Sequence, residues 1–239
     1  MELLLLSNST QFGHPMLSHA AEEITAHFPS KKVIFVPFAM ADLDGYTAAV
    51  SRALEPMEIE ITGIHTVDDP GTAIRDAGAV YVGGGNSFRL LKSLQERGLL
   101  ETISGAVADG AHYMGASAGS NVACPTIRTS NDMPIVQPAG FDALDLIPFQ
   151  INPHFVSADP ASTHMGETRE KRIAEFHECN DVTVLGLREG AWLKVSGQQA
   201  TLGGTTGAVL LDRGKDPILL TTGANLSELL SRTPHFDIA

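Results

Sequence analysis

Short apolar runs alternate with amphipathic segments through the first half of the chain, and this alternation restricts the fold more than any other feature. Apolar residues recur at helical spacing at residues 16–28, 46–54, 73–77 and 87–100. Strand-like runs lie at residues 3–7, 32–38, 59–65, 79–82 and 112–115. This pattern predicts an α/β fold with a mostly parallel sheet flanked by helices on both faces.

The second half of the chain is richer in strands. We expect one helix at residues 167–178 and hairpin turns at residues 196–198 and 212–216. Strand-like runs lie at residues 182–187, 191–195, 199–202, 208–211 and 218–221. The 239 residues contain no repeat and no plausible linker, so we expect a single domain over residues 1–239 with a strand-rich C-terminal part.

Composition argues against several classes of protein. A net charge of −12 and a pI near 5.1 argue against nucleic-acid binding, which requires a basic surface. The apolar N-terminal stretch is short and carries Glu2 where a signal peptide has a base, and no later run is long enough to cross a membrane. Cys124 and Cys179 have neither disulfide nor metal-ligand spacing. We therefore expect a cytoplasmic protein without membrane or nucleic-acid partners.

The stretch Gly115-Ala116-Ser117-Ala118-Gly119 lies between a predicted strand and a segment that can open a helix. This Gly-x-Ser-x-Gly pattern is that of the nucleophile elbow of α/β hydrolytic enzymes, in which small residues permit a sharp turn that exposes the serine hydroxyl. Five-residue patterns also recur by chance. A Gly/Ser-rich turn fits the same residues equally well.

A second glycine-rich loop, Gly83-Gly84-Gly85-Asn86, lies between a predicted strand and a helix that Asn86 can cap. Its backbone N–H groups suit either a phosphate or an oxyanion. The match to a dinucleotide motif is poor, because Phe88 occupies the last glycine position and no Walker lysine follows. In an oxyanion hole, Gly85 and Ala118 would donate to one carbonyl oxygen. A plain helix-entry turn is the third interpretation.

A serine nucleophile needs a general base, and His154 is the strongest candidate among nine histidines. It follows Pro153, which fixes a non-helical backbone after a strand-like run at residues 144–148, although a solvated loop histidine fits as well. Carboxylates that could orient the imidazole are Asp132, Asp142, Asp145, Asp159 and Glu189. No His-x-x-x-His, Cys-x-x-Cys or carboxylate cluster indicates a metal, so we expect chemistry without metal or cofactor.

Longer blocks of the sequence resemble the peptidase E family of serine peptidases. The resemblance runs from Met1 to about Gly204 and thins beyond that point. The blocks that carry it are residues 83–88, 117–119, 123–129, 131–136, 140–146, 150–155 and 166–170. The resemblance implies a flavodoxin-like fold related to the class I glutamine amidotransferases. It also implies a cytosolic enzyme that hydrolyses dipeptides whose first residue is L-aspartate.

The resemblance also implies roles for individual residues. Ser117 corresponds to the nucleophile and His154 to the base, while Gly85 and Ala118 correspond to the donors of the oxyanion hole.

The third member of the triad stays open. In this family the acids corresponding to Asp132 and to Glu189 are both candidates. We slightly prefer Asp132, because a short loop just past the elbow helix can reach the base.

Arg169 corresponds to the residue that recognises the aspartyl side chain, and Thr168 can assist through its hydroxyl. A guanidinium can hold a carboxylate with two hydrogen bonds, and an acidic protein needs such a local cation. Without the family context, pairing of Arg169 with Glu167 or Glu170 on a helix surface would be favoured. The loop at residues 156–165 is slightly longer than in the family, and this length could alter substrate access or lid behaviour.

The expected function is therefore that of a serine-type dipeptidase acting on Asp-X dipeptides through an acyl-enzyme on Ser117. A cyanophycinase-like peptidase or an esterase would use the same serine on another acyl group. A non-catalytic, flavodoxin-like ligand-binding module is the alternative from another class. The expected partners are small acidic dipeptides. A monomer and a small homo-oligomer are equally compatible with the sequence, which also leaves the preference at the second residue open.

Overall fold

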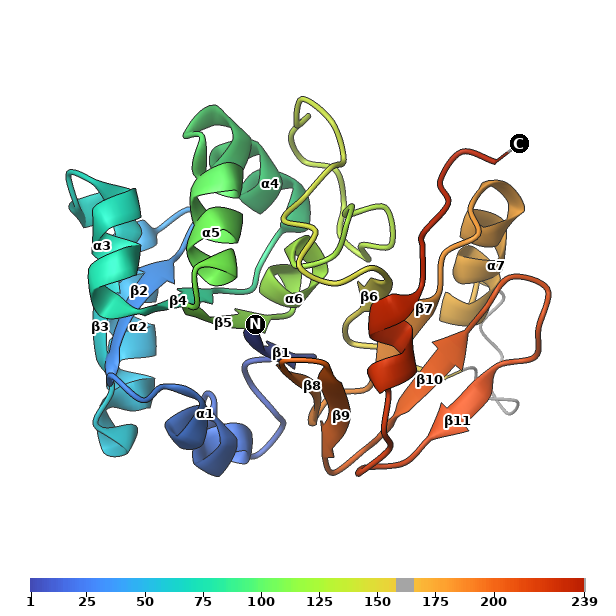
Figure 1. Ribbon diagram of the computed structural model, residues 1–239, viewed down its shortest axis with the longest axis horizontal. Helices are drawn as coiled ribbons and strands as arrows, with labels where there is room; N and C mark the ends of the chain where they lie inside the picture. The colour runs from blue at the N-terminus through green and yellow to red at the C-terminus, as the bar shows by residue number, and fades with distance from the viewer. Residues whose placement is uncertain (158–165, 239) are drawn as a thin grey trace.

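The strands form two sheets in the computed structural model, which describes residues 1–157 and 166–238 (Figure 1). In the larger sheet the first five strands are parallel, and β8 and β9 add an antiparallel edge next to β1. Their order is β3 (Glu60–Gly63), β2 (Lys32–Val36), β4 (Ala79–Val82), β5 (His112–Ala116), β1 (Glu2–Leu6), β8 (Ala191–Ser196) and β9 (Gln199–Gly204). The predicted mostly parallel sheet is confirmed.

The smaller sheet contains most of the strand-rich C-terminal part. Within it β6 and β7 are parallel, whereas β10 and β11 are antiparallel to their neighbours. The order is β11 (Ile218–Leu220), β10 (Ala208–Leu211), β7 (Val184–Leu187) and β6 (Gln150–Asn152). The two expected hairpins are present, because β8 pairs with β9 and β10 pairs with β11.

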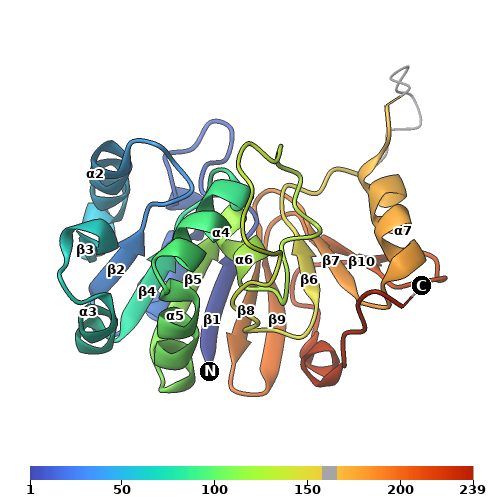
Figure 2. The same cartoon turned by 90° about the horizontal axis from the view of Figure 1, so that it is seen from above.

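Helices cover both faces of the larger sheet (Figure 2). They are α1 (Ala21–His27), α2 (Leu43–Leu54), α3 (Pro70–Ala77), α4 (Ser87–Glu96), α5 (Leu99–Ala108) and α6 (Ala118–Val122). The remaining described helix, α7 (Arg169–Cys179), packs on the smaller sheet. Single turns of 3-10 helix lie at Ser18–Ala20, Glu55–Met57, Ile64–Thr66 and Ser227–Ser231.

The apolar run of β1 shows why the first half folds in this way. Leu4 and Leu6 share an apolar cluster with α1 and α2, while Leu3 and Leu5 share another with α3, α4 and α5. All four leucines are fully buried. Since successive side chains of a strand point to opposite faces, a run of four leucines fits a strand that is covered on both sides.

Three expected elements differ from the structure. The helix expected at residues 87–100 is divided into α4 and α5, because Gly98 has a φ of 64° and starts a new helix. The helix expected at residues 16–28 begins as 3-10 turn, and α1 starts at Ala21. The stretch at residues 144–148 is not a strand, since the N–H groups of Leu144 and Leu146 donate to carbonyls at the end of α6.

The core continues from the larger sheet into the smaller one, with Leu187 and Leu210 in the same apolar cluster as Leu5. A single domain stays a prediction. No helix within residues 1–157 and 166–238 has the length and apolarity needed to cross a membrane. Residues 158–165, which form most of the loop that departs from the family pattern, lie outside the described residues.

Candidate active site

Ser117 lies at a sharp turn between β5 and α6. Its backbone has a φ of 54° and a ψ of −111°, a conformation that costs energy for any residue with a side chain. The surrounding structure holds the turn in place. The Ser117 N–H donates to the carbonyl of Leu6 at 3.0 Å, and the Ser120 hydroxyl donates to the same carbonyl at 2.6 Å.

The two glycines of the elbow are required by close packing. A Cβ atom on Gly115 would lie 2.5 Å from the carbonyl oxygen of Gly119, and one on Gly119 would collide with the carbonyl of Val82 in β4. The Gly-x-Ser-x-Gly spacing therefore allows α6 to pack directly on the strands. This geometry is that of a nucleophile elbow rather than of an unspecialised turn.

His154 lies on the loop after β6, with its Nε2 3.0 Å from the Ser117 hydroxyl oxygen. Its own φ is 52°, another positive value for a non-glycine residue. The buried hydroxyl of Ser7 accepts a hydrogen bond from the His154 N–H at 2.9 Å, and the Phe155 N–H donates to the Leu187 carbonyl at 2.9 Å. Both contacts hold the loop backbone from which the imidazole reaches the serine.

Glu189, in the turn between β7 and β8, accepts a hydrogen bond from His154. The distance from its Oε1 to the His154 Nδ1 is 2.7 Å. Because an ionised carboxylate only accepts, this contact places the ring proton on Nδ1 and leaves Nε2 free to accept from Ser117. The three side chains form one hydrogen-bonded chain from carboxylate to hydroxyl.

The preference for Asp132 as the orienting acid was wrong. Its Oδ2 accepts from both the backbone N–H and the hydroxyl of Ser87, each at 2.7 Å. Ser87 is the first residue of α4, where the unpaired N–H groups and the helix dipole favour a carboxylate. Asp132 is thus engaged at a helix N-terminus, and Glu189 lies beside His154.

The glycine loop at residues 83–86 lies against the elbow. A Cβ atom on Gly84 would lie 3.1 Å from the Cβ of Ser117, and Gly85 has a φ of 133° that favours glycine. Among the described residues, neither the Gly85 nor the Ala118 N–H donates a hydrogen bond to the protein. These two free donors next to the serine fit an oxyanion hole better than a phosphate site.

The hydroxyl of Tyr46 contacts the backbone of this loop. Burial raises the pKa of its hydroxyl to about 12, and the N–H of Gly84 donates a hydrogen bond to the hydroxyl oxygen. Asn86 caps α4 by accepting from the Arg89 N–H at 3.0 Å, as predicted. Both contacts hold the backbone that carries the Gly85 donor.

Arg169 reaches the same site from the start of α7. Its Nη1 donates to the Oδ1 of Asn131 at 2.6 Å. Burial lowers the pKa of Arg169, the like charge of Arg172 lowers it further, and Asp132 opposes both. Arginine stays charged despite such a shift. Glu167, a partner considered from the sequence, lies instead against Lys171 and Arg172.

Thr168 has a structural role in α7. Its hydroxyl accepts from the Lys171 N–H at 3.2 Å and caps the helix. Ser7 and Asn131, which hold the His154 backbone and the Arg169 side chain respectively, were not recognised from the sequence. Neither belongs to a motif that carries chemistry, and Asn131 stood out only as a neighbour of Asp132. Of the other acids considered, Asp159 lies outside the described residues.

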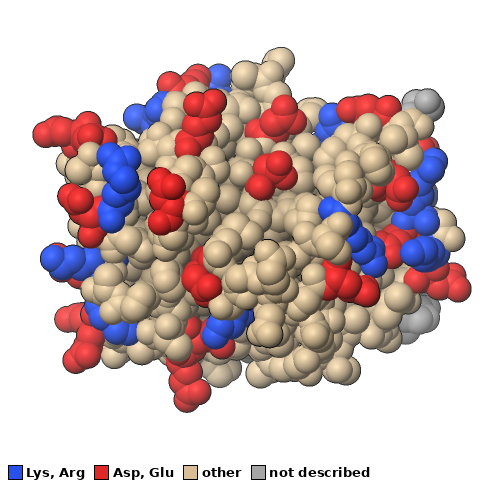
Figure 3. Space-filling model, viewed as in Figure 1, with Lys and Arg blue, Asp and Glu red and all other residues tan. Residues whose placement is uncertain are grey.

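Acidic side chains outnumber basic ones in this chain, with 28 Asp and Glu against 16 Lys and Arg. On the face shown in Figure 3, Asp and Glu are spread over the surface with Lys and Arg between them. With a net charge of −12, the chain as a whole repels anions. A negatively charged ligand therefore depends on local cations such as Arg169.

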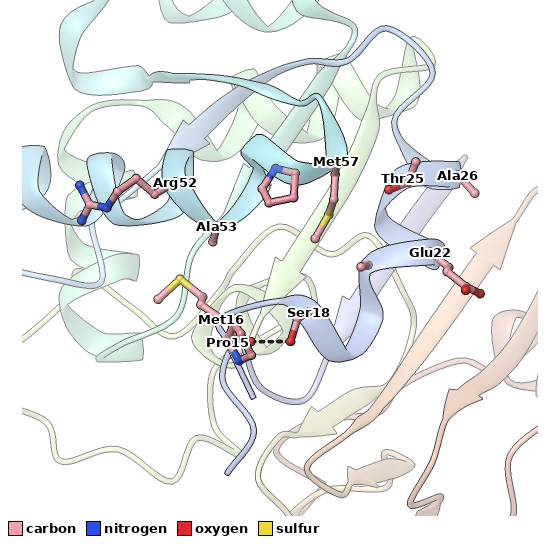
Figure 4. A pocket seen from close by; sticks show the side chains of 11 residues that line it. Pro15, Met16, Ser18, Glu22, Thr25, Ala26, Arg52, Ala53 and Met57 are labelled. Carbon is pink, nitrogen blue, oxygen red and sulfur yellow. Dashed lines mark hydrogen bonds between the residues drawn. The ribbon is translucent and has the colours of Figure 1, made fainter. Parts of the chain in front are cut away.

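A separate apolar hollow of about 840 Å³ lies between the start of α1 and the end of α2 (Figure 4). Its lining includes Met16, Ala53 and Met57, with Glu22 and Arg52 as its charged members. It contains none of the candidate site residues. The hollow is therefore distinct from the candidate site around Ser117.

Comparison with known proteins identifies the family. Residues 3–203 match Peptidase family S51. Peptidase E of Streptomyces coelicolor is 54% identical over 238 residues, which cover 99% of this chain and 98% of that protein. Peptidase E of Citrobacter koseri is 52% identical over 227 residues, which cover 93% and 99%. The chain belongs to peptidase family S51.

Two solved structures share the fold of this family member. A putative peptidase E protein from Listeria monocytogenes EGD-e has a TM-score of 0.65 at 24% identity, over 85% of this chain and 98% of that one. A peptidase from an acI-B1 Actinobacterium has a TM-score of 0.70 at 16% identity, over 94% and 96%. The family and its curated relatives show a serine-type dipeptidase, and the alternative of a non-catalytic binding module was wrong.

Proposed function

We propose that this S51 peptidase hydrolyses dipeptides with an N-terminal L-aspartate, through an acyl-enzyme on Ser117. The observation that carries the proposal is the hydrogen-bonded chain from Glu189 through His154 to Ser117, with the cation of Arg169 held beside it. A nucleophile with an oriented base performs acyl transfer, and a fixed guanidinium selects an acidic side chain.

In the first half of the reaction, the Ser117 oxygen attacks the carbonyl carbon of the aspartyl residue while His154 Nε2 takes the hydroxyl proton. Glu189 stabilises the imidazolium that forms. The negative charge that develops on the carbonyl oxygen is received by the N–H groups of Gly85 and Ala118. His154 then gives the proton to the departing amine, and the peptide bond breaks.

In the second half, water replaces the departed amino acid. His154 Nε2 takes a proton from the water as its oxygen attacks the ester carbonyl of the acyl-enzyme. The second tetrahedral intermediate collapses, the proton returns to the Ser117 oxygen, and free aspartate leaves. No step requires a metal or a cofactor.

Arg169 supports the choice of substrate. Desolvation of a partly buried guanidinium costs free energy unless it is hydrogen-bonded or paired, and its Nη1 is already directed by Asn131. An aspartyl side chain has the short reach and the charge that such a group binds. The partners we propose are accordingly small acidic dipeptides, handled in the cytoplasm by a monomer or a small homo-oligomer.

The test is a comparison of Asp-Leu with Leu-Asp, a β-aspartyl dipeptide and a simple ester. We expect Asp-Leu to be hydrolysed best, Ser117→Ala to be inactive, and Arg169→Met to lose about 100-fold or more in kcat/KM on Asp-Leu alone. An enzyme that prefers the β-aspartyl peptide or the ester would be a cyanophycinase-like peptidase or an esterase instead. An equal loss on every substrate would remove Arg169 as the specificity residue.

A further inference from the structure

Asn131 connects three parts of the site through one side chain. Its Oδ1 accepts from Arg169 Nη1 at 2.6 Å and from Asn152 Nδ2 at 2.9 Å. Its Nδ2 donates to the carbonyl of Pro153 at 2.8 Å. These contacts reach the first turn of α7, the end of β6, and the residue immediately before His154.

The segment that carries Asn131 is itself anchored to the oxyanion loop. Asp132 accepts two hydrogen bonds from Ser87, and the Asp132 N–H donates to the Ser130 hydroxyl at 3.1 Å. Asn86 donates from its Nδ2 to the Met133 carbonyl at 2.8 Å. Residues on both sides of Asn131 are thus tied to the start of α4, so the amide is held at a fixed position.

An amide is the side chain that this position requires. Arginine is a donor only and a backbone carbonyl an acceptor only, so the group between them must offer one acceptor and one donor. A carboxylate would accept from Arg169 as well, but it would lose the donor to Pro153. It would also neutralise the cation that an acidic substrate needs.

We infer that Asn131 is a positioning residue that aims Arg169 at the substrate carboxylate while leaving its charge available, and that it also steadies the loop carrying His154. This inference rests on the proposed function, because it concerns the selection of an acidic first residue. The preference for aspartate then depends on a neutral neighbour as well as on the arginine itself.

The decisive experiment measures kcat and KM of wild type and Asn131→Asp on Asp-Leu and on Asn-Leu, which differ by one charge. We expect kcat/KM on Asp-Leu to fall about 30-fold or more, mainly through KM, and kcat/KM on Asn-Leu to change by less than about threefold. The matched control is Asn225→Asp, which adds the same charge at an exposed turn and should leave kcat/KM unchanged on both substrates.

A double-mutant cycle separates positioning from simple damage to the fold. If Asn131 acts through Arg169, Asn131→Asp should have almost no further effect on the ratio of the two substrates in an Arg169→Met background. Asn131→Ser, which is smaller and neutral, should keep more of the preference for Asp-Leu than Asn131→Asp does. Labelling of Ser117 by a phosphonylating reagent reports that each variant is folded.

The inference is overturned if Asn131→Asp affects both dipeptides equally, or if its effect on their ratio adds in full to that of Arg169→Met. A wild-type enzyme without preference for Asp-Leu would refute both the proposed function and the inference about Asn131. A wild-type preference that survives in Asn131→Asp would remove the inference alone.

Discussion

At the scale of single residues, the candidate site contains two acids with different tasks. Glu189 faces the imidazole, whereas Asp132 holds the N-terminus of α4 and thereby the segment that contains Asn131. Substitution of either acid can lower activity, but for separate reasons. Loss of Glu189 should change mainly kcat, whereas loss of Asp132 should change mainly the free energy of unfolding.

We expect Glu189→Gln to lower kcat by about 10²- to 10⁴-fold with little effect on stability, since an amide cannot stabilise the imidazolium as a carboxylate does. Asp132→Asn should retain much more of kcat and lower the free energy of unfolding by about 1 kcal/mol, because a helix-capping anion is lost. Steady-state kinetics and urea unfolding of both variants check this. A larger loss of kcat in Asp132→Asn than in Glu189→Gln would contradict the geometry.

At the scale of elements, the break between α4 and α5 depends on one backbone conformation. Gly98 has a φ of +64°, and nothing lies within 4 Å of a Cβ atom placed there. Gly105, inside α5, is also free of neighbours but has an ordinary helical backbone. A comparison of substitutions at the two glycines therefore separates the effect of backbone strain from that of side-chain packing.

We expect Gly98→Ala to lower the free energy of unfolding by about 1 kcal/mol, because alanine is strained at positive φ. Gly105→Ala should raise it by about 0.5–1 kcal/mol, because alanine loses less backbone entropy in a helix. Urea unfolding measures both. Equal changes in the free energy of unfolding of the two variants would show that the positive φ of Gly98 is not what separates α4 from α5.

At the scale of the whole molecule, a buried histidine links stability to pH. His27, the last residue of α1, has its Nε2 3.0 Å from the Tyr113 carbonyl of β5. Burial lowers its pKa from 6.5 to about 4, and the neighbouring His112 adds to this, while the hydrogen bond to Tyr113 opposes it. Protonation of this side chain would place a charge between a helix and the central sheet.

Because the folded pKa lies below the unfolded one, the unfolded state binds more protons between these values. The free energy of unfolding should therefore fall by up to about 3 kcal/mol as pH falls from 6.5 to 4. His27→Gln should flatten this part of the profile in urea unfolding, whereas His235→Gln, at an exposed position, should leave it as in wild type. A profile unchanged by His27→Gln would assign the acid sensitivity to other groups.

Most elements could be predicted from the sequence because their causes are local. Alternating apolar runs place the strands of the larger sheet, and the glycine loop and elbow follow two of those strands directly. The prediction of a strand at residues 144–148 was wrong, because an apolar run by itself does not show which element the run packs against. That stretch bonds to the end of α6, and β6 begins only at Gln150.

Periodicity and spacing within short stretches of the sequence were enough to predict the fold class and the candidate serine. The setting after Pro153 made His154 the strongest candidate base, and the family resemblance supported it and added Arg169. The third partner depended on tertiary structure. Parallel pairing of β6 with β7, with Asn152 opposite Gly186, brings the loops after both strands to one edge, so that Glu189 meets His154. Pairing between strands far apart in sequence is a tertiary property, and it determined which carboxylate lies beside His154.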